Sequence, residues 1–181
     1  MDERNVSAEA FLDDDEELSI EDGGVPLEVR QRMVLALDVD DLVEARRLAG
    51  VLAPYFGTVK IGLELYTASG PEAVGVFVED GFDVFCDLKL HDIPNTVGRT
   101  ARVAGSLGVR WLTVHVSGGE TMLRSAVDGL AEGASGASLE TPGVLGITVL
   151  TSDKVARPEQ LEDRCRLAAD SGGGSGRGAA V

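Results

Sequence analysis

The chain has 181 residues, of which 44% are hydrophobic and 4% are aromatic, and its formal net charge is −15. It has enough apolar residues to bury a core, but an acidic chain is poorly suited to bind nucleic acid. Its two cysteines give no disulfide framework, and its apolar runs are too short to span a membrane. Its first residues do not resemble a signal peptide, so we expect a cytoplasmic protein with no membrane partner.

The negative charge is concentrated near the N-terminus. Residues 1–24 contain ten acidic residues and one basic residue, and they show no apolar periodicity. Such a segment buries too little apolar surface to fold, so we predict an acidic, disordered tail over residues 1–29, with an entry segment beginning at Pro26. We predict the folded domain over residues 30–172 and a glycine-rich disordered tail over residues 173–181.

From residue 33 onward, apolar runs alternate with segments of helical periodicity. The apolar runs predict strands over residues 33–39, 58–62, 82–89, 109–116 and 144–150. The periodic segments predict helices over residues 42–52, 71–80, 94–107, 121–130 and 158–169. We expect Asp40 or Asp41 to cap the first helix and Gly81 to end the second, whereas the small residues 133–138 predict a linker.

Five strand–helix units in succession predict an α/β fold with a parallel sheet and right-handed connections. An open doubly wound sheet and a (β/α)₈ barrel both fit this pattern, and periodicity does not distinguish them. A complete barrel usually needs roughly 250 residues, more than this chain contains. In both architectures the functional groups lie at the carboxyl ends of the strands.

A charged segment ends the third predicted strand. Residues 87–96 read DLKLHDIPNT, so two carboxylates, Asp87 and Asp92, flank the ammonium group of Lys89. Alternation along a strand places Asp87 and Lys89 on one face, whereas Asp92 lies on the turn into the next helix. Charges are costly where a buried strand finishes, so this pattern alone indicates either a catalytic site or a structural ion-pair network.

Several segments together resemble the bacterial type of orotidine 5′-monophosphate decarboxylase, over about residues 30–172. The matching segments are LALDVD, VKIGLEL, DVFCDLKLHDIPNTV, LTVHVSGG and GITVLTS. The third is highly specific, and the others support it by their order and spacing. The resemblance implies a TIM (β/α)₈ barrel with about five βα units in this chain, a homodimer, no metal and no organic cofactor. It also implies decarboxylation of orotidine 5′-monophosphate to UMP, the last step of de novo pyrimidine biosynthesis.

The resemblance further implies roles for individual residues. Lys89 matches the proton donor to C6 of the pyrimidine, and Asp87 matches the carboxylate beside the departing CO₂ group. Lys60 matches the lysine that links this carboxylate to the ribose hydroxyls, and Asp38 matches a ribose-binding aspartate. The chemistry agrees, because decarboxylation without a cofactor leaves an electron pair on carbon that a fixed cation must stabilise. Repulsion between Asp87 and the substrate carboxylate is relieved when neutral CO₂ leaves.

Three further residues match substrate contacts of the family. Asp92 and Thr96 match residues that reach across the dimer interface into the partner subunit's site, and Thr151 matches a hydroxyl residue that contacts the pyrimidine. Simpler explanations exist for some of these positions, since Thr96 fits the first turn of a helix and Thr151 fits a helix cap. Likewise, Asp38 fits a cap before the first helix, and Lys60 could extend from a sheet edge.

The remaining polar and aromatic candidates have structural explanations. His91 and His115 show no metal-ligand spacing with another histidine or cysteine, so we expect no metal there. Cys86 and Trp111 are expected in the core.

The family continues past the fifth unit with three more strands, which carry the phosphate-binding groups and a closing loop. Residues 173–181 instead show no apolar periodicity, so we expect a truncated or frame-disrupted chain. Three alternatives to an active decarboxylase therefore stay open. They are an inactive fragment of the same enzyme, a Mg²⁺-dependent sugar-phosphate enzyme of the same barrel superfamily, and a non-enzymatic binding or assembly role.

Overall fold

The computed structural model describes residues 25–150, 152 and 158–172. The strands in this part of the chain are β1 (Val34–Leu37), β2 (Thr58–Gly62), β3 (Asp83–Leu90), β4 (Val109–His115) and β5 (Gly143–Ile147). The helices are α1 (Leu27–Arg30), α2 (Leu42–Leu52), α3 (Leu63–Ser69), α4 (Pro71–Glu79), α5 (Pro94–Ser106), the short 3₁₀ helix η1 (Val116–Gly118), α6 (Glu120–Gly136) and α7 (Pro158–Ser171). The predicted alternation is confirmed, and α1 and α3 are additional helices.

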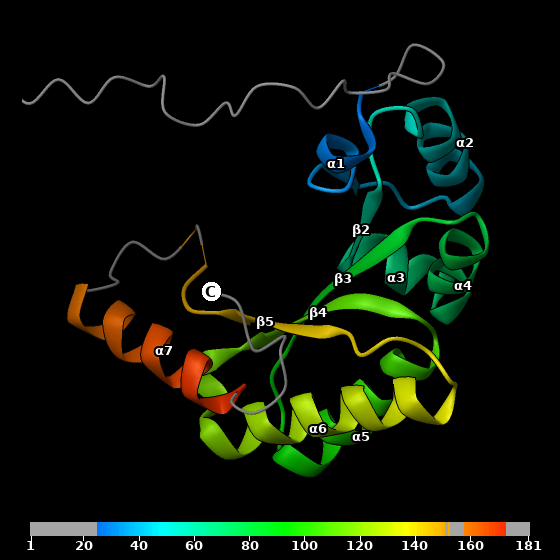
Figure 1. Ribbon diagram of the computed structural model, residues 1–181. Helices are drawn as coiled ribbons and strands as arrows, with labels where there is room; N and C mark the ends of the chain where they lie inside the picture. Colours follow the sequence, from blue (N-terminus) through cyan, green and yellow to red (C-terminus); the bar gives the residue numbers. More distant parts are fainter. Residues whose placement is uncertain (1–24, 151, 153–157, 173–181) are drawn as a thin grey trace, which may run out of the picture.

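The strands form one parallel sheet in the order β1-β2-β3-β4-β5. A doubly wound sheet reverses its strand order at a switch point, whereas a barrel adds each strand beside the preceding one. Figure 1 shows a curved sheet with α2, α4, α5 and α6 following one another along its outer side. The described sheet therefore consists of five consecutive βα units of a TIM barrel, which decides between the two predicted architectures.

The main core lies between the sheet and these outer helices. Alternate strand residues such as Ile61 and Leu112 are fully buried and belong to the same apolar cluster as Phe77 of α4. Because side chains alternate along a strand, the neighbours of Ile61 in β2, Lys60 and Gly62, face the opposite side of the sheet. The helix-covered face thus holds the core, and the inner face is free to present polar groups.

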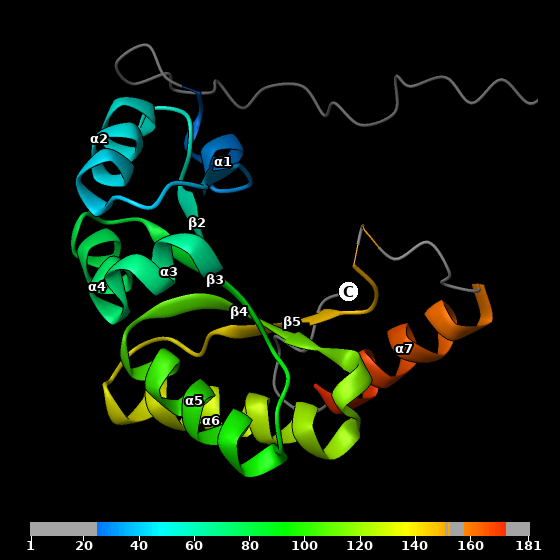
Figure 2. The ribbon, with the colours of Figure 1, turned by 180° about the vertical axis from the view of Figure 1, so that it is seen from behind.

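Helix α6 is longer than predicted. The small residues 133–138 were expected to form a linker, but the helix continues to Gly136. The reason is its packing against α5, beside which it lies in Figure 2. A Cβ on Gly129 would overlap the carbonyl oxygen of Gly98, and a Cβ on Gly133 would overlap that of Arg102. These glycines let the two helix backbones touch, and close packing outweighs their low helix propensity.

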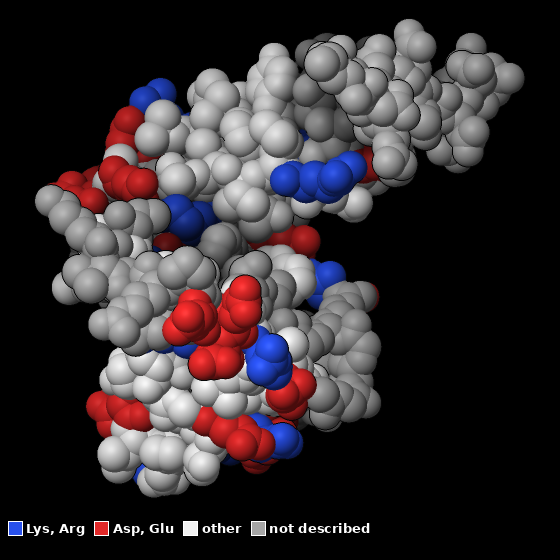
Figure 3. All heavy atoms as spheres, turned by 90° about the vertical axis from the view of Figure 1, so that its left-hand side faces the viewer, with Lys and Arg blue, Asp and Glu red and all other residues white. Residues whose placement is uncertain are grey.

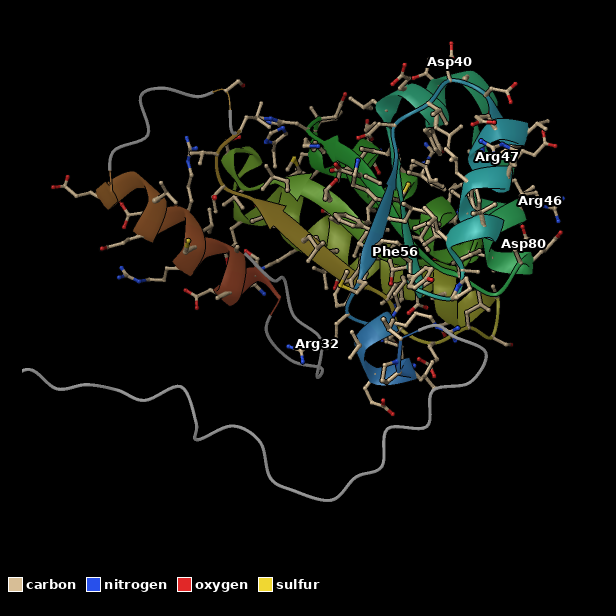
Figure 4. All side chains as sticks on the ribbon, turned by 90° about the horizontal axis from the view of Figure 1, so that it is seen from above. Arg32, Asp40, Arg46, Arg47, Phe56 and Asp80 are labelled. Atoms are coloured by element: carbon tan, nitrogen blue, oxygen red, sulfur yellow. The ribbon has the colours of Figure 1, made fainter. Side chains whose placement is uncertain are left out.

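Local signals position α2 and α4. Asp41 is the N-cap of α2, where its carboxylate accepts a 2.7 Å hydrogen bond from the backbone nitrogen of Glu44. Gly81, with φ of +86°, follows the end of α4 as predicted. The guanidinium group of Arg46 donates hydrogen bonds of 2.8 and 2.7 Å to the two carboxylate oxygens of Asp80. This contact, labelled in Figure 4, ties α2 to the turn after α4.

Helix α7 packs against α6 and η1, with Ala168 and Ser171 buried. Its other side exposes charged residues, and Arg166 lies 4.0 Å from Asp163. Figure 3, which views the flank where α7 lies, shows acidic and basic groups interspersed there. Across all described helices, none combines the length and the apolar character needed to cross a bilayer.

On the inner face, Trp111 of β4 covers the edge strand β5. Its register partner is Gly143, where a Cβ would overlap the indole ring. The guanidinium carbon of Arg110 lies 5.6 Å from the centre of the Trp111 ring, within cation–π distance. Trp111 is only partly buried, because it packs on the open face of the sheet and not under the helices.

Candidate active site

Charged side chains gather at the carboxyl ends of β1, β2 and β3. The ammonium group of Lys60 lies 2.9 Å from Oδ1 of Asp38, which follows β1. The ammonium group of Lys89 lies 2.8 Å from both Oδ1 and Oδ2 of Asp87, in β3. The carboxyl ends of neighbouring parallel strands meet at one edge of a sheet. The structure therefore brings together four of the predicted site residues.

Gly62 lies between these two ion pairs. It pairs in register with Asp87, so both residues face the same side of the sheet. A Cβ on Gly62 would lie 3.6 Å from Nζ of Lys60 and 3.7 Å from Oδ1 of Asp38, which places their ion pair over Gly62. The missing side chain leaves space beside the ammonium group of Lys60.

Lys60 does not make the contact that was expected from the resemblance. It was predicted to link Asp87 to the ribose, but within the described residues its ion pair is with Asp38 and not with Asp87. Each ammonium group thus has its own carboxylate. Asp38 lies over Gly62 together with Lys60, whereas both carboxylate oxygens of Asp87 accept hydrogen bonds from Lys89.

The backbone of β3 is irregular at Lys89. Cys86 pairs with Leu112 and Leu90 pairs with Val114, so three residues, from Asp87 to Lys89, lie opposite Thr113 alone. Within this β-bulge, Lys89 has φ of +51°. The left-handed region costs a residue with a Cβ about 1–2 kcal/mol. Strain of this kind, at a strand end and on a charged residue, is typical of functional sites.

Thr113, which the sequence motifs did not single out, contacts both members of the Lys89–Asp87 pair. Its hydroxyl oxygen accepts a 2.8 Å hydrogen bond from the backbone nitrogen of Lys89. The same hydroxyl donates a 3.0 Å hydrogen bond to Oδ1 of Asp87. Thr113 is fully buried. The sequence signal was a hydroxyl residue in an apolar strand, but threonine is common in strands, so the signal was not specific.

Asp92 and Thr96 lie apart from this cluster. Asp92 is exposed, and its carboxylate accepts a 2.7 Å hydrogen bond from the backbone nitrogen of Ile93. Thr96 is exposed in the first turn of α5. Within the described part of this chain, Lys89 therefore contacts one carboxylate and not the two that flank it in the sequence. The prediction that Asp92 and Thr96 reach into a partner's site stays a prediction, and Thr151 lies outside the described residues.

The two histidines lie near the same end of the sheet. The ring centres of His91 and His115 are 5.6 Å apart and the rings are tilted by 44°. Over residues 25–150, 152 and 158–172, no group of three or more histidine, cysteine, aspartate and glutamate side chains could hold a metal ion. The two rings therefore lie close together at a tilted angle.

An apolar cavity of about 230 Å³ lies on the other side of β3, beneath the outer helices. Cys86 and Leu88 line it together with side chains such as Tyr66 and Val103. Burial, and to a smaller extent the negative charge of Asp87, raise the pKa of Cys86 to about 12, so its thiol is neutral and unreactive. The cavity offers no charged group, which makes the inner face, with its lysines and aspartates, the candidate active site.

The strand order of the sheet and the position of these charged residues define the class of protein. It is a TIM-barrel protein with lysine and aspartate side chains at the carboxyl ends of the strands, where TIM barrels have their active sites. Comparison with known proteins specifies it further. The chain belongs to the orotidine 5′-phosphate decarboxylase / HUMPS family, whose model matches residues 31–167.

Curated relatives and solved structures agree with this assignment. Orotidine 5′-phosphate decarboxylase of Moorella thermoacetica is 44% identical over 128 residues, which are 71% of this chain and 51% of that protein. The enzyme of Heliobacterium modesticaldum is 41% identical over 144 residues, 76% of this chain and 59% of that protein. The chain thus spans about half the length of these relatives. The crystal structure of the Lactobacillus acidophilus enzyme superposes with a TM-score of 0.66 at 32% identity, covering 79% of this chain and 68% of that one.

Proposed function

We propose that this chain carries the catalytic groups of an orotidine 5′-monophosphate decarboxylase, which converts its substrate to UMP and CO₂ without a cofactor. The observation that carries the proposal is the bidentate contact of Lys89 with Asp87 at the strand end of a barrel sheet. Family membership supports it, because the curated relatives named above are decarboxylases of this substrate.

The proposed reaction follows from this pair. The bond between C6 of the pyrimidine and its carboxylate breaks, CO₂ leaves, and the electron pair stays on C6. The ammonium group of Lys89 stabilises this developing charge and then donates a proton to C6, and the lysine regains a proton from water. Asp87 holds the ammonium group in place. Its negative charge also disfavours the bound substrate carboxylate more than the departing neutral CO₂.

The other residues of the proposal bind the substrate. Asp38 and Lys60 form an ion pair that is open to solvent on the side of Asp38, whose side chain is 68% exposed, so hydroxyl groups of a ribose can reach it. Thr151 is proposed to contact the pyrimidine. Asp92 and Thr96 are proposed to act in the site of a second subunit of a homodimer, which agrees with their exposure and their lack of contacts to Asp87.

The direct test is a decarboxylation assay on the purified chain, with UMP as the measured product. Three proteins are compared: the wild type, Lys89→Met, and Arg124→Met as a matched loss of an exposed cation on α6. The proposal expects UMP from the wild type and the Arg124 variant, and at least about a thousandfold less from the Lys89 variant. Absence of UMP from the wild type would contradict it, and Mg²⁺-dependent turnover of a sugar phosphate would instead support the sister activity.

A mixing experiment tests the shared site. Asp92→Asn and Lys89→Met each remove a group from the same proposed site, but from different subunits. Mixed dimers of the two variants contain one site with both wild-type groups, so we expect activity to reappear on mixing. Two variants that stay inactive after mixing, while dimers form, would place Asp92 outside the partner's site.

A further inference from the structure

We propose that Thr113 is a positioning residue of this site, whose buried hydroxyl group holds the Asp87 carboxylate and the Lys89 backbone in one fixed arrangement. Its kinetic consequence rests on the proposed function. The positions of the Thr113 hydroxyl, the Asp87 carboxylate and the Lys89 backbone do not depend on the proposed function, because they are contacts within the sheet.

The bulge in β3 creates the need for such a residue. Regular pairing between β3 and β4 stops at Cys86 and Leu112 and resumes at Leu90 and Val114. The residues between them cannot use the normal ladder of backbone hydrogen bonds. At this point the backbone nitrogen of Lys89 donates instead to the hydroxyl of Thr113, at 2.8 Å. A side chain on the neighbouring strand thus replaces a backbone acceptor.

The hydroxyl hydrogen fixes the second partner. A hydroxyl group has one hydrogen to donate and lone pairs that accept. Since the oxygen of Thr113 accepts from Lys89, its hydrogen is free to point at Oδ1 of Asp87, 3.0 Å away. The same Oδ1 also accepts from the ammonium group of Lys89 at 2.8 Å. The result is a closed ring of contacts that runs from the Lys89 backbone through Thr113 and Asp87 to the Lys89 side chain.

Burial makes this ring rigid. Thr113 is 0% exposed, so water cannot replace either of its hydrogen bonds. The φ of +51° at Lys89 is a strained conformation that persists only where neighbouring contacts hold it. Thr113 supplies one such contact at the backbone, and thereby controls where the ammonium group stands relative to Asp87. Small displacements of a reacting group are expensive, since about 1 Å can cost a hundredfold in rate.

The test compares Thr113→Val, which keeps the shape and removes the hydroxyl, with Thr113→Ser, which keeps the hydroxyl. Thr58→Val is the matched control, because Thr58 is also a buried threonine but lies at the start of β2, at the far end of the sheet. We measure kcat, KM, the melting temperature, and amide hydrogen exchange at Lys89 by NMR. Thr113→Val is expected to lower kcat by about 10- to 100-fold with KM within about threefold, while Thr113→Ser and Thr58→Val stay near the wild type.

The exchange measurement is independent of activity. Without the hydroxyl acceptor, the Lys89 amide is expected to exchange at least about tenfold faster in Thr113→Val, whereas amides elsewhere in β3 and β4 keep their rates. Unchanged exchange at Lys89, or an equal loss of kcat in Thr113→Ser and Thr113→Val with a lowered melting temperature in both, would overturn the inference. If the wild type makes no UMP, the proposed function fails, and the exchange at Lys89 alone decides the role of Thr113.

Discussion

Lys89 and Asp87 are held together by two hydrogen bonds of 2.8 Å, although one residue alone separates them along β3. At Lys89 the backbone is left-handed, with φ of +51°, and lies inside the bulge. The ammonium group thus extends from an unusual backbone conformation and is held by the charge of Asp87. Substitutions at Lys89 can therefore differ in their free energy of unfolding while all of them remove the ammonium group that the proposed reaction needs.

The strain at Lys89 predicts an inverted order of stability. Lys89→Gly and Lys89→Ala both remove the ammonium group, and both are expected to lack decarboxylation. Glycine adopts a positive φ at no steric cost, so Lys89→Gly should have a free energy of unfolding about 1 kcal/mol higher than Lys89→Ala. Urea denaturation of the two variants measures the difference. An alanine variant that is the more stable of the two would show that the left-handed backbone carries no strain.

The ion pair over Gly62 predicts a defect in binding. Asp38→Asn removes the charge of a mostly exposed carboxylate, so the free energy of unfolding should change by less than about 1 kcal/mol. Loss of a hydrogen bond from a charged group to the ribose should weaken UMP binding by about 10- to 100-fold, with a smaller change in kcat. Titration calorimetry with UMP and steady-state kinetics measure the two effects. An unchanged UMP affinity would remove Asp38 from the binding site.

The close crossing of α5 and α6 predicts opposite effects for two alanine substitutions in one helix. A Cβ on Gly133 would overlap the backbone of Arg102, whereas a Cβ on Gly136 would have no atom within 4 Å. Gly133→Ala should lower the free energy of unfolding by about 1–3 kcal/mol through overpacking. Gly136→Ala, the matched control, should raise it by up to about 1 kcal/mol through helix propensity, less near the helix end. Urea denaturation at constant pH measures both.

The two cysteines predict selective alkylation. Cys86 is buried and its pKa is raised to about 12, whereas Cys165 is partly exposed on α7. At about pH 8, almost none of the Cys86 thiol is ionised, so iodoacetamide should modify Cys165 first in the native protein. Both should react after denaturation. Mass spectrometry of the labelled peptides tests this, and equal labelling in the native state would show that the cavity opens to solvent.

The Arg46–Asp80 contact predicts a pH-dependent contribution to stability. Hydrogen bonds from Arg46 lower the pKa of Asp80 below its usual value, so the folded state favours the ionised carboxyl. Stability from this pair is present above the unfolded-state pKa and is lost as the pH falls through the folded-state pKa. The wild type should therefore exceed Asp80→Asn in unfolding free energy at about pH 6, and this difference should shrink below about pH 3. In an Arg46→Met background, the same comparison should show little dependence on pH.

The sequence predicted the type and order of the five strands that the described residues form, because aliphatic runs bounded by glycine, proline and acidic residues are strong local signals. It also predicted that Asp87 and Lys89 share a face, which their hydrogen bonds confirm. The prediction of a linker over residues 133–138 was wrong, because glycine can have opposite effects on a helix. It breaks isolated helices, but it also permits the backbone contact that extends α6 along α5.

Details of the site required the register of the strands. The residue types at positions 87–89 do not predict a bulge, because the bulge arises from the pairing of β3 with β4. For the same reason Thr113 was not distinguishable from an ordinary strand threonine. The ion-pair partner of Lys60 also required the structure, since Asp38 follows β1 and Asp87 lies in β3, the two strands next to β2, and Asp38 is the one that lies with Lys60 over Gly62. The predicted role of Lys60 in linking Asp87 to the ribose stays a prediction.

Trp111 rests on Gly143 across the β4–β5 boundary, and it is the one tryptophan among the 181 residues. The tryptophan fluorescence therefore comes from a single position, where β4 pairs with β5. A strand that docks beside β5 is expected to alter the surroundings of that indole. The protein thus contains its own optical probe for barrel closure, readable in a cuvette without added label.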